Sequence, residues 1–354
     1  MQPRHAQPET LTRRVARTNT ATVERGNKKP AGKQTDFVLS MPHARSAAVT
    51  GSFTNWDLNR TPTVTKDPTA VEMEAQAAYL TVFADGDRLF VPRVFGWVIE
   101  CFTGHYRDYQ AVDAHYHDFE HTLQGTLCMA RLLRGRHLAG AQPALSQRMF
   151  QLGLLAILLH DTGYLKKRDD TKGTGAKYTI THVERSADFA ARLLAEKGFS
   201  ASDIKAVQNM IHCTGVDAQL SAIPFQNELE KIAGFALGTA DLLGQMAAED
   251  YVDKLPILYS EFAEAVRYSK DKAHFIARFA NADDLMEHTP VFWEGFVRNR
   301  LESDFAGLHR FLADPYPSGP NQYMEQIEAN IARLRRRMPA TASGPHRETG
   351  VNTP

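Results

Sequence analysis

The sequence lacks several features that would place a protein in a class at once. Only three of its 354 residues are cysteines, widely spaced, which argues against a disulfide framework and fits a reducing compartment. No apolar run could span a bilayer, and the first residues lack the apolar core of a secretory signal. Basic and acidic residues each number 41, so no charge excess indicates a nucleic-acid or anionic-membrane surface. We therefore expect a cytoplasmic protein that binds neither nucleic acid nor membrane.

The two ends of the chain differ in composition from its middle. Residues 1–35 carry eight lysines and arginines with few apolar residues, which predicts a disordered basic arm. Residues 339–354 are rich in proline, glycine, threonine and serine and are predicted to form a disordered tail. Between the arm and the helices, residues 36–70 contain short strand-like runs separated by turn residues, which predicts a short β segment.

Residues 75–335 are predicted to form a helical domain, because apolar residues recur there at three- and four-residue steps. The segment Arg148–His160 is apolar nearly all round and should be a central buried helix. The other predicted helices cover 74–83, 94–102, 121–133, 181–197, 202–212, 228–246, 257–268, 290–312 and 325–336. The expected fold class is therefore mainly α, with the short β segment near the N-terminus.

A histidine and an aspartate, His160 and Asp161, stand at the end of the apolar run Leu152–Leu159. Such groups at the end of a buried helix are unfavourable unless something neutralises or coordinates them. Four further candidate ligands lie on other predicted helices: His121, His182, His212 and Asp241. This mixed set of nitrogen and oxygen donors could hold two divalent cations and suits Fe, Mn, Zn or Mg better than a structural zinc site, which would prefer thiolates.

The run Tyr116-His117-Asp118-x-x-His121-Thr122 resembles the signature of class I cyclic-nucleotide phosphodiesterases, within the HD superfamily of metal-dependent phosphohydrolases. The resemblance implies an HD-type helical bundle, in which His117 protonates the leaving oxygen and His121 binds metal. His160-Asp161 matches the HD pair and Asp241 the closing aspartate. His182 and His212 are similar to the two extra histidines of HD-GYP cyclic-di-GMP phosphodiesterases.

This chain departs from those patterns at three points. Asp118 stands where the phosphodiesterases have asparagine, and no Gly-Tyr-Pro element follows His212. Tyr164 stands where HD-GYP proteins have a lysine that contacts phosphate, although Lys166 and Lys167 are close and are candidate phosphate contacts. The resemblance therefore indicates metal binding more strongly than it indicates a substrate.

A second resemblance concerns the predicted β segment. Residues 51–57, Gly-Ser-Phe-Thr-Asn-Trp-Asp, resemble the start of glycogen-binding β-sandwich modules, and Trp56 could stack on a sugar ring. After Pro68 the pattern turns helical, so the segment would be a truncated module with weak glucan binding.

The residues together favour hydrolysis of a phosphoester, such as a cyclic or linear nucleotide. Two cations would lower the pKa of a bridging water, and the resulting hydroxide would attack phosphorus. Asp161 would bridge the cations and His117 would donate the proton, so these two are the candidate catalytic residues. Two alternatives stay open: a di-iron oxygenase built on the same six ligands, and a non-catalytic metal-binding sensor or scaffold.

Overall fold

The computed structural model describes residues 37–38, 48–49, 65–269 and 275–337. The predicted arm at residues 1–35, the tail at 339–354 and Trp56 lie outside the described residues. The chain divides into two units, Met1–Asp57 and Leu58–Pro354. In the first, strands β1 (Phe37–Val38) and β2 (Ala48–Val49) pair antiparallel, with Phe37 opposite Val49. This pair agrees with the strand-like runs expected there.

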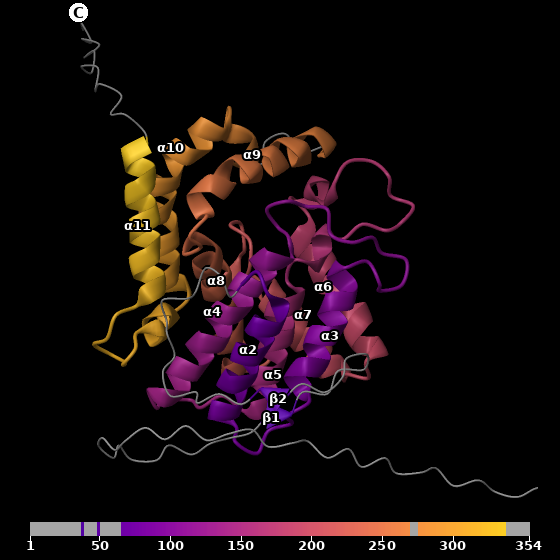
Figure 1. The fold of residues 1–354 in the computed structure, drawn as a ribbon, viewed down its shortest axis with the longest axis vertical. Helices are drawn as coiled ribbons and strands as arrows, with labels where there is room; N and C mark the ends of the chain where they lie inside the picture. Colours follow the sequence, from indigo (N-terminus) through magenta and orange to yellow (C-terminus); the bar gives the residue numbers. More distant parts are fainter. Residues whose placement is uncertain (1–36, 39–47, 50–64, 270–274, 338–354) are drawn as a thin grey trace, which may run out of the picture. The chain divides into compact units, whose positions relative to one another are not determined.

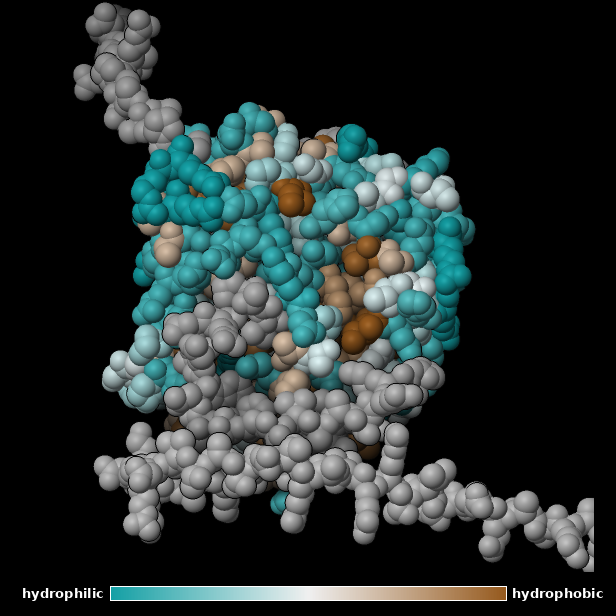
Figure 2. All heavy atoms as spheres, in the orientation of Figure 1, coloured by the Kyte–Doolittle hydropathy of each residue, from teal (hydrophilic) through white to brown (hydrophobic). Residues whose placement is uncertain are grey.

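The described part of the second unit consists mainly of helices joined by loops, which confirms the mainly α fold class (Figure 1). None of its described helices has the length and apolarity needed to cross a membrane. The α-helices are α2 (Pro68–Val82), α3 (Phe90–Phe102), α4 (Phe119–Leu138), α5 (Gln147–Leu159), α6 (His182–Glu196), α7 (Ala201–Ile211), α8 (Glu228–Met246), α9 (Tyr251–Tyr268), α10 (Ala282–Phe292) and α11 (Gln322–Arg337). On the face shown in Figure 2 the described surface is mostly hydrophilic, with apolar side chains visible in a few places.

Helix α5 forms the centre of the bundle. Its residues from Met149 to Leu159 are all buried, as the uninterrupted apolar run requires, because a helix that is apolar all round needs neighbours on every side. Those neighbours are α3, α4, α6, α7 and α8 (Figure 1). The helix begins at the cap Ser146, whose side chain accepts a hydrogen bond from the Met149 backbone N–H. It ends at Leu159, so His160 and Asp161 emerge at one end of the bundle.

Helices α9 and α10 pack against each other in a second layer, and α11 packs against α8, α9 and α10. After α10 the chain forms two π-helical turns, Trp293–Val297 and Arg300–Asp304, and then a short 3-10 helix, Leu308–Leu312. The single helix predicted over 290–312 is therefore wrong. Gly307, with a φ of 67°, adopts the left-handed conformation that separates the last π-helical turn from the 3-10 helix.

Candidate metal centre

His160 is held in a defined orientation by the end of α5. Its Nδ1 lies 2.7 Å from the backbone carbonyl oxygen of Ile157. A carbonyl oxygen only accepts hydrogen bonds, so Nδ1 carries a proton and Nε2 of the neutral ring keeps its lone pair. A backbone carbonyl that fixes the tautomer in this way is the usual arrangement behind a metal-binding histidine.

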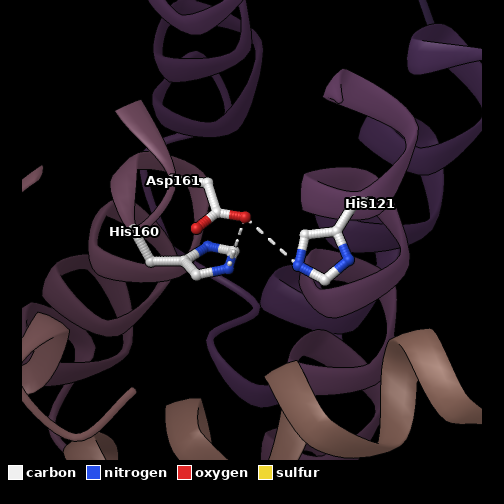
Figure 3. Close-up of side chains that lie close together, drawn as sticks. All are labelled: His121, His160 and Asp161. Atoms are coloured by element: carbon white, nitrogen blue, oxygen red, sulfur yellow. Dashed lines mark ion pairs between the residues drawn. The ribbon is translucent and has the colours of Figure 1, made fainter. Parts of the chain in front are cut away.

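Asp161 and His121 meet this ring in the bundle interior (Figure 3). Asp161 Oδ2 lies 3.3 Å from His160 Nε2 and 3.2 Å from His121 Nε2. His121 stands in the first turn of α4, where its backbone N–H donates to the cap Asp118. A metal site needs at least three histidine, cysteine or acidic side chains close together. Within the described ranges, one such group has all its ligand atoms within 4.8 Å of one another: His121, His160 and Asp161. All three side chains are buried.

Asp241 reaches the same point from the middle of α8. Its Oδ1 lies 3.3 Å from His121 Nε2 and 3.4 Å from His160 Nε2. Helix α8 approaches α4 closely because Gly244 has no side chain: a Cβ there would lie 2.8 Å from the Gly125 backbone nitrogen. The close contact one turn from Asp241 therefore brings its carboxylate within reach of the α4 histidine.

His182 comes from the opposite side of Asp161. It is the first residue of α6, its Nδ1 lies 2.6 Å from the Thr179 carbonyl oxygen, and its Nε2 lies 3.9 Å from Asp161 Oδ1. The approach depends on Gly163, because a Cβ at that position would lie 2.1 Å from the His182 carbonyl oxygen. The two oxygens of Asp161 thus face different histidines, Oδ2 toward His121 and His160 and Oδ1 toward His182.

His212 is less closely engaged. It follows α7 as its C-cap, lines the same cavity as the other histidines, and places Nδ1 3.5 Å from the exposed carboxylate of Glu184. The structure therefore brings four predicted ligands within contact distance of the fifth, Asp161, or of a histidine next to it. It puts the sixth on the wall of the same cavity, beside an acid that the sequence did not single out.

The buried groups are incompletely satisfied by protein atoms alone. His160 Nε2 and Asp161 Oδ2 have no hydrogen-bond partner with acceptable geometry, although both atoms are buried. Burial would by itself lower the pKa of His121, but the carboxylates of Asp161 and Asp241 raise that pKa to about 10. Burial would raise the pKa of Asp161, but the His160 and His121 rings hold it well below its usual range. A cation at this point would satisfy the free atoms and displace the proton.

The predicted acid, His117, has a partner that sequence reasoning missed. Its Nδ1 lies 2.6 Å from Oε2 of Glu261, a buried residue of α9. Oε1 of Glu261 accepts hydrogen bonds of 2.7 Å from the backbone N–H groups of His115 and Tyr116, which fixes the carboxylate. Burial would raise the pKa of Glu261, but His117 and these hydrogen bonds lower it below its ordinary value. A signal existed: Glu261 stands beside Phe262 and one turn from Ala265 on the apolar face of its helix.

The two candidate phosphate contacts do not belong to the site. Lys166 is buried, and its Nζ donates to the Gly173 carbonyl oxygen at 2.6 Å and pairs with Asp113 at 2.8 Å. Lys167 pairs with Asp108 at 2.8 Å. Neither is among the described residues that line the cavity. Closeness to Asp161 in the sequence therefore did not place these lysines on the cavity wall.

The candidate ligands open onto a cavity of about 660 Å³. His117, His121, Asp161, His182, His212 and Asp241 all contribute to its wall. A volume of this size accommodates a small organic ligand rather than a single ion or a macromolecule.

Comparison with known proteins gives one family assignment. No protein in the curated set matches the chain. The model of the Npun_R2479-like family matches residues 103–310, more than half of the chain, and this range contains every candidate ligand and Glu261. The chain therefore belongs to the Npun_R2479-like family.

Proposed function

We propose that this protein is a metal-dependent phosphoester hydrolase with an HD-type helical bundle and two divalent cations. The observation that carries the proposal is the position of Asp161 between histidines on two sides: its Oδ2 faces His121 and His160, and its Oδ1 faces His182. A carboxylate placed in this way can bridge two cations. An ion pair between Asp161 and His121 alone would not need two further imidazoles beside the same carboxylate.

The donor set fits two cations. His121, His160, Asp161 Oδ2 and Asp241 would hold the first, and Asp161 Oδ1 with His182 and His212 would hold the second. Burial lowers the pKa of His182, which keeps that ring neutral and its lone pair available. When bound, the two cations would lower the pKa of a water between them and neutralise charge on a phosphate.

His117 is placed to move the proton. Glu261 holds Nδ1, so Nε2 of a protonated ring is left to donate, and the ring stacks on Tyr164 with centroids 4.5 Å apart. The Tyr164 phenol has a pKa well above its ordinary value because it is buried, so it stays neutral beneath the ring. The presence of His117 as a candidate acid favours hydrolysis over a di-iron oxygenase with the same ligands. A leaving alkoxide needs a proton as its bond to phosphorus breaks, and His117 could supply it.

The test is metal content followed by turnover on a panel of phosphoesters. Purified protein should carry up to two Fe, Mn or Zn ions per chain and hydrolyse a phosphoester, and chelation should abolish turnover until a cation is restored. His117→Ala should keep the cations and lose about 10²–10⁴-fold in kcat on alkyl esters, with a smaller loss on p-nitrophenyl esters. The exposed neighbour His115 provides the control variant His115→Ala. Metal-free protein with full activity would end the proposal.

A further inference from the structure

The cavity continues beyond the candidate metal centre into a space that the proposed chemistry does not use. Its wall there comes from α8, α9, α10 and the first π-helical turn. We call this part the apolar chamber and define it by six residues: Leu242, Met246, Leu258, Phe262, Phe292 and Phe296. It belongs to the same cavity as His117 and Asp241, so one ligand can touch both regions.

Four of the six residues of the chamber leave part of their apolar surface exposed toward the cavity. Leu242, Leu258, Phe292 and Phe296 are only half-buried although they line a concave wall. The rings of Phe292 and Phe296 stack, with centroids 5.1 Å apart and planes at 17°. Phe296 stands in a π-helical turn, a local change of helical register that is frequent at functional sites. Apolar surface facing a cavity is stabilised when an apolar ligand displaces water from it.

Positive charge is scarce along the described part of this wall. Its lysines and arginines are Lys205, which is exposed, and Arg300. The Arg300 guanidinium is already engaged: it donates to the Ala218 carbonyl oxygen at 3.2 Å and lies 5.4 Å from the Phe296 ring centroid. Among the described residues of the wall, a polyphosphate would therefore find no cluster of basic side chains of the kind that such ligands usually require. The candidate cations themselves are the place for a single phosphate group.

The amide side chain that follows Asp241 by one helical turn is already engaged within the protein. Gln245 lines the cavity one turn after Asp241, but both ends of its side chain are occupied. Its amide nitrogen donates to the Asp241 carbonyl oxygen at 3.1 Å, and its oxygen accepts from the Tyr116 hydroxyl at 3.0 Å. A nucleobase would have to displace these contacts to be read by this residue.

We propose that the substrate is a phosphoester of a long-chain apolar alcohol, with its hydrocarbon part in the apolar chamber and its phosphate at the cations. The proposal rests on the proposed function and names its substrate class. In the reaction, the oxygen of water forms a bond to phosphorus, and the bond from phosphorus to the alcohol oxygen breaks with its electron pair. The alcohol oxygen takes a proton from His117, and the proton that water gives up restores the ring.

Binding of alkylphosphonates tests the chamber without requiring turnover, because their carbon–phosphorus bond is not hydrolysed. Calorimetry on the full chain loaded with Mn²⁺ should show the dissociation constant falling about fourfold per fully buried methylene from ethyl- to octylphosphonate. Tighter binding of a nucleoside phosphonate than of octylphosphonate, or no dependence on chain length, would overturn the proposal.

A pair of neighbouring variants locates the effect in the chamber. Phe292→Asp should flatten the chain-length dependence, whereas Val291→Asp, on the same helix at a residue that is 68% exposed and outside the cavity wall, should preserve it. Melting temperatures check folding, and Leu258→Ser replaces Phe292→Asp if that variant does not fold. An unchanged chain-length dependence in the folded variant would overturn the placement.

Turnover separates this proposal from the one on which it rests. If the protein hydrolyses p-nitrophenyl phosphate but its affinity for alkylphosphonates does not depend on chain length, the proposed substrate class is wrong and the proposed hydrolase activity stands. If affinity rises steeply with chain length but no phosphoester is hydrolysed with any cation tested, the proposed hydrolase activity is wrong. The chamber would then bind an apolar phosphoryl ligand without hydrolysing it.

Discussion

Replacing Asp161 by asparagine separates a metal centre from a buried network of ion pairs. The substitution keeps the size of the side chain but removes its charge, and with it the ability to bridge two cations. Both Oδ2, between His121 and His160, and Oδ1, facing His182, are affected at once. Asp161→Asn should therefore lose both cations and all turnover.

The magnitudes distinguish the two readings. Removing one partner from a buried ion pair destabilises a protein by about 3–5 kcal/mol, whether or not metal is present. A cation supplied at a hundredfold excess over its dissociation constant adds about 2.7 kcal/mol to the wild-type protein. At about 1–2 °C per kcal/mol for a chain of this size, the wild type should melt about 3–5 °C higher with Mn²⁺ than with chelator. The variant should melt at the same temperature in both.

Differential scanning fluorimetry with Mn²⁺ and with chelator measures these shifts, and elemental analysis measures the metal. Asp203→Asn is the matched control, because Asp203 also pairs with a cationic side chain, Arg148 at 2.6 Å, but lies outside the cavity wall. It should lose stability equally in both buffers and keep the full metal-dependent shift. An Asp161→Asn protein that keeps this shift would refute the metal centre and leave only the ion pairs.

Three further results are expected. Glu261→Gln should leave metal content unchanged and lower kcat most for esters with basic leaving groups, as steady-state rates across leaving groups will show; an equal loss for all leaving groups would contradict the acid's orientation. Gly163→Ala should weaken binding of the second cation, because the added Cβ would push back the His182 carbonyl oxygen, and titration calorimetry measures this loss of affinity. Gly96→Ala is the control: its Cβ would meet nothing within 4 Å, so it should stabilise helix α3 by about 0.5–1 kcal/mol. The pKa of His121 without metal is raised to about 10. The stabilisation that its charged ring contributes is therefore full below about pH 6.5 and disappears as the pH rises through about 10. Chelated protein should melt at a lower temperature at pH 9.5 than at pH 7, whereas metal-loaded protein should not. A chelated protein whose melting temperature rises over that range would contradict the assigned protonation.

The buried helices could be predicted closely because their apolar pattern is set by burial. The range predicted for α8, Glu228–Met246, is the range observed, and α5 differs by one residue at each end from Arg148–His160. The prediction for α9 began too late, at Ile257, because Pro256 normally cannot stand inside a helix. The structure accommodates this proline in the second turn of α9, which begins at Tyr251. Packing against α10 and α11 stabilises that helix, and tertiary contacts of this kind leave little trace in local sequence.

The cluster of candidate metal ligands could be predicted because a carboxylate and several imidazoles at the ends of buried helices need partners. What the sequence could not supply was the set of partners from distant helices. Glu261 is 144 residues from His117, and only the packing of α9 brings the two together. Lys166 and Lys167 show the opposite case, because they are close to Asp161 in the sequence but do not line the cavity. Ion pairs with Asp113 and Asp108 hold their side chains elsewhere.

The helices divide the work of the candidate site. Successive helices α4 to α8 and their ends supply the candidate metal ligands. Helix α9 supplies the partner of the candidate acid and, with α10 and the first π-helical turn, most of the apolar chamber. Substitutions in the second group should therefore change which ester is bound while leaving the cations in place. Glu261 is the exception that couples the two groups: it fixes the backbone at His115 and Tyr116 and the ring of His117. A ligand that moves α9 would shift the acid as well, so the fit of the apolar chain and the rate of proton donation should change together.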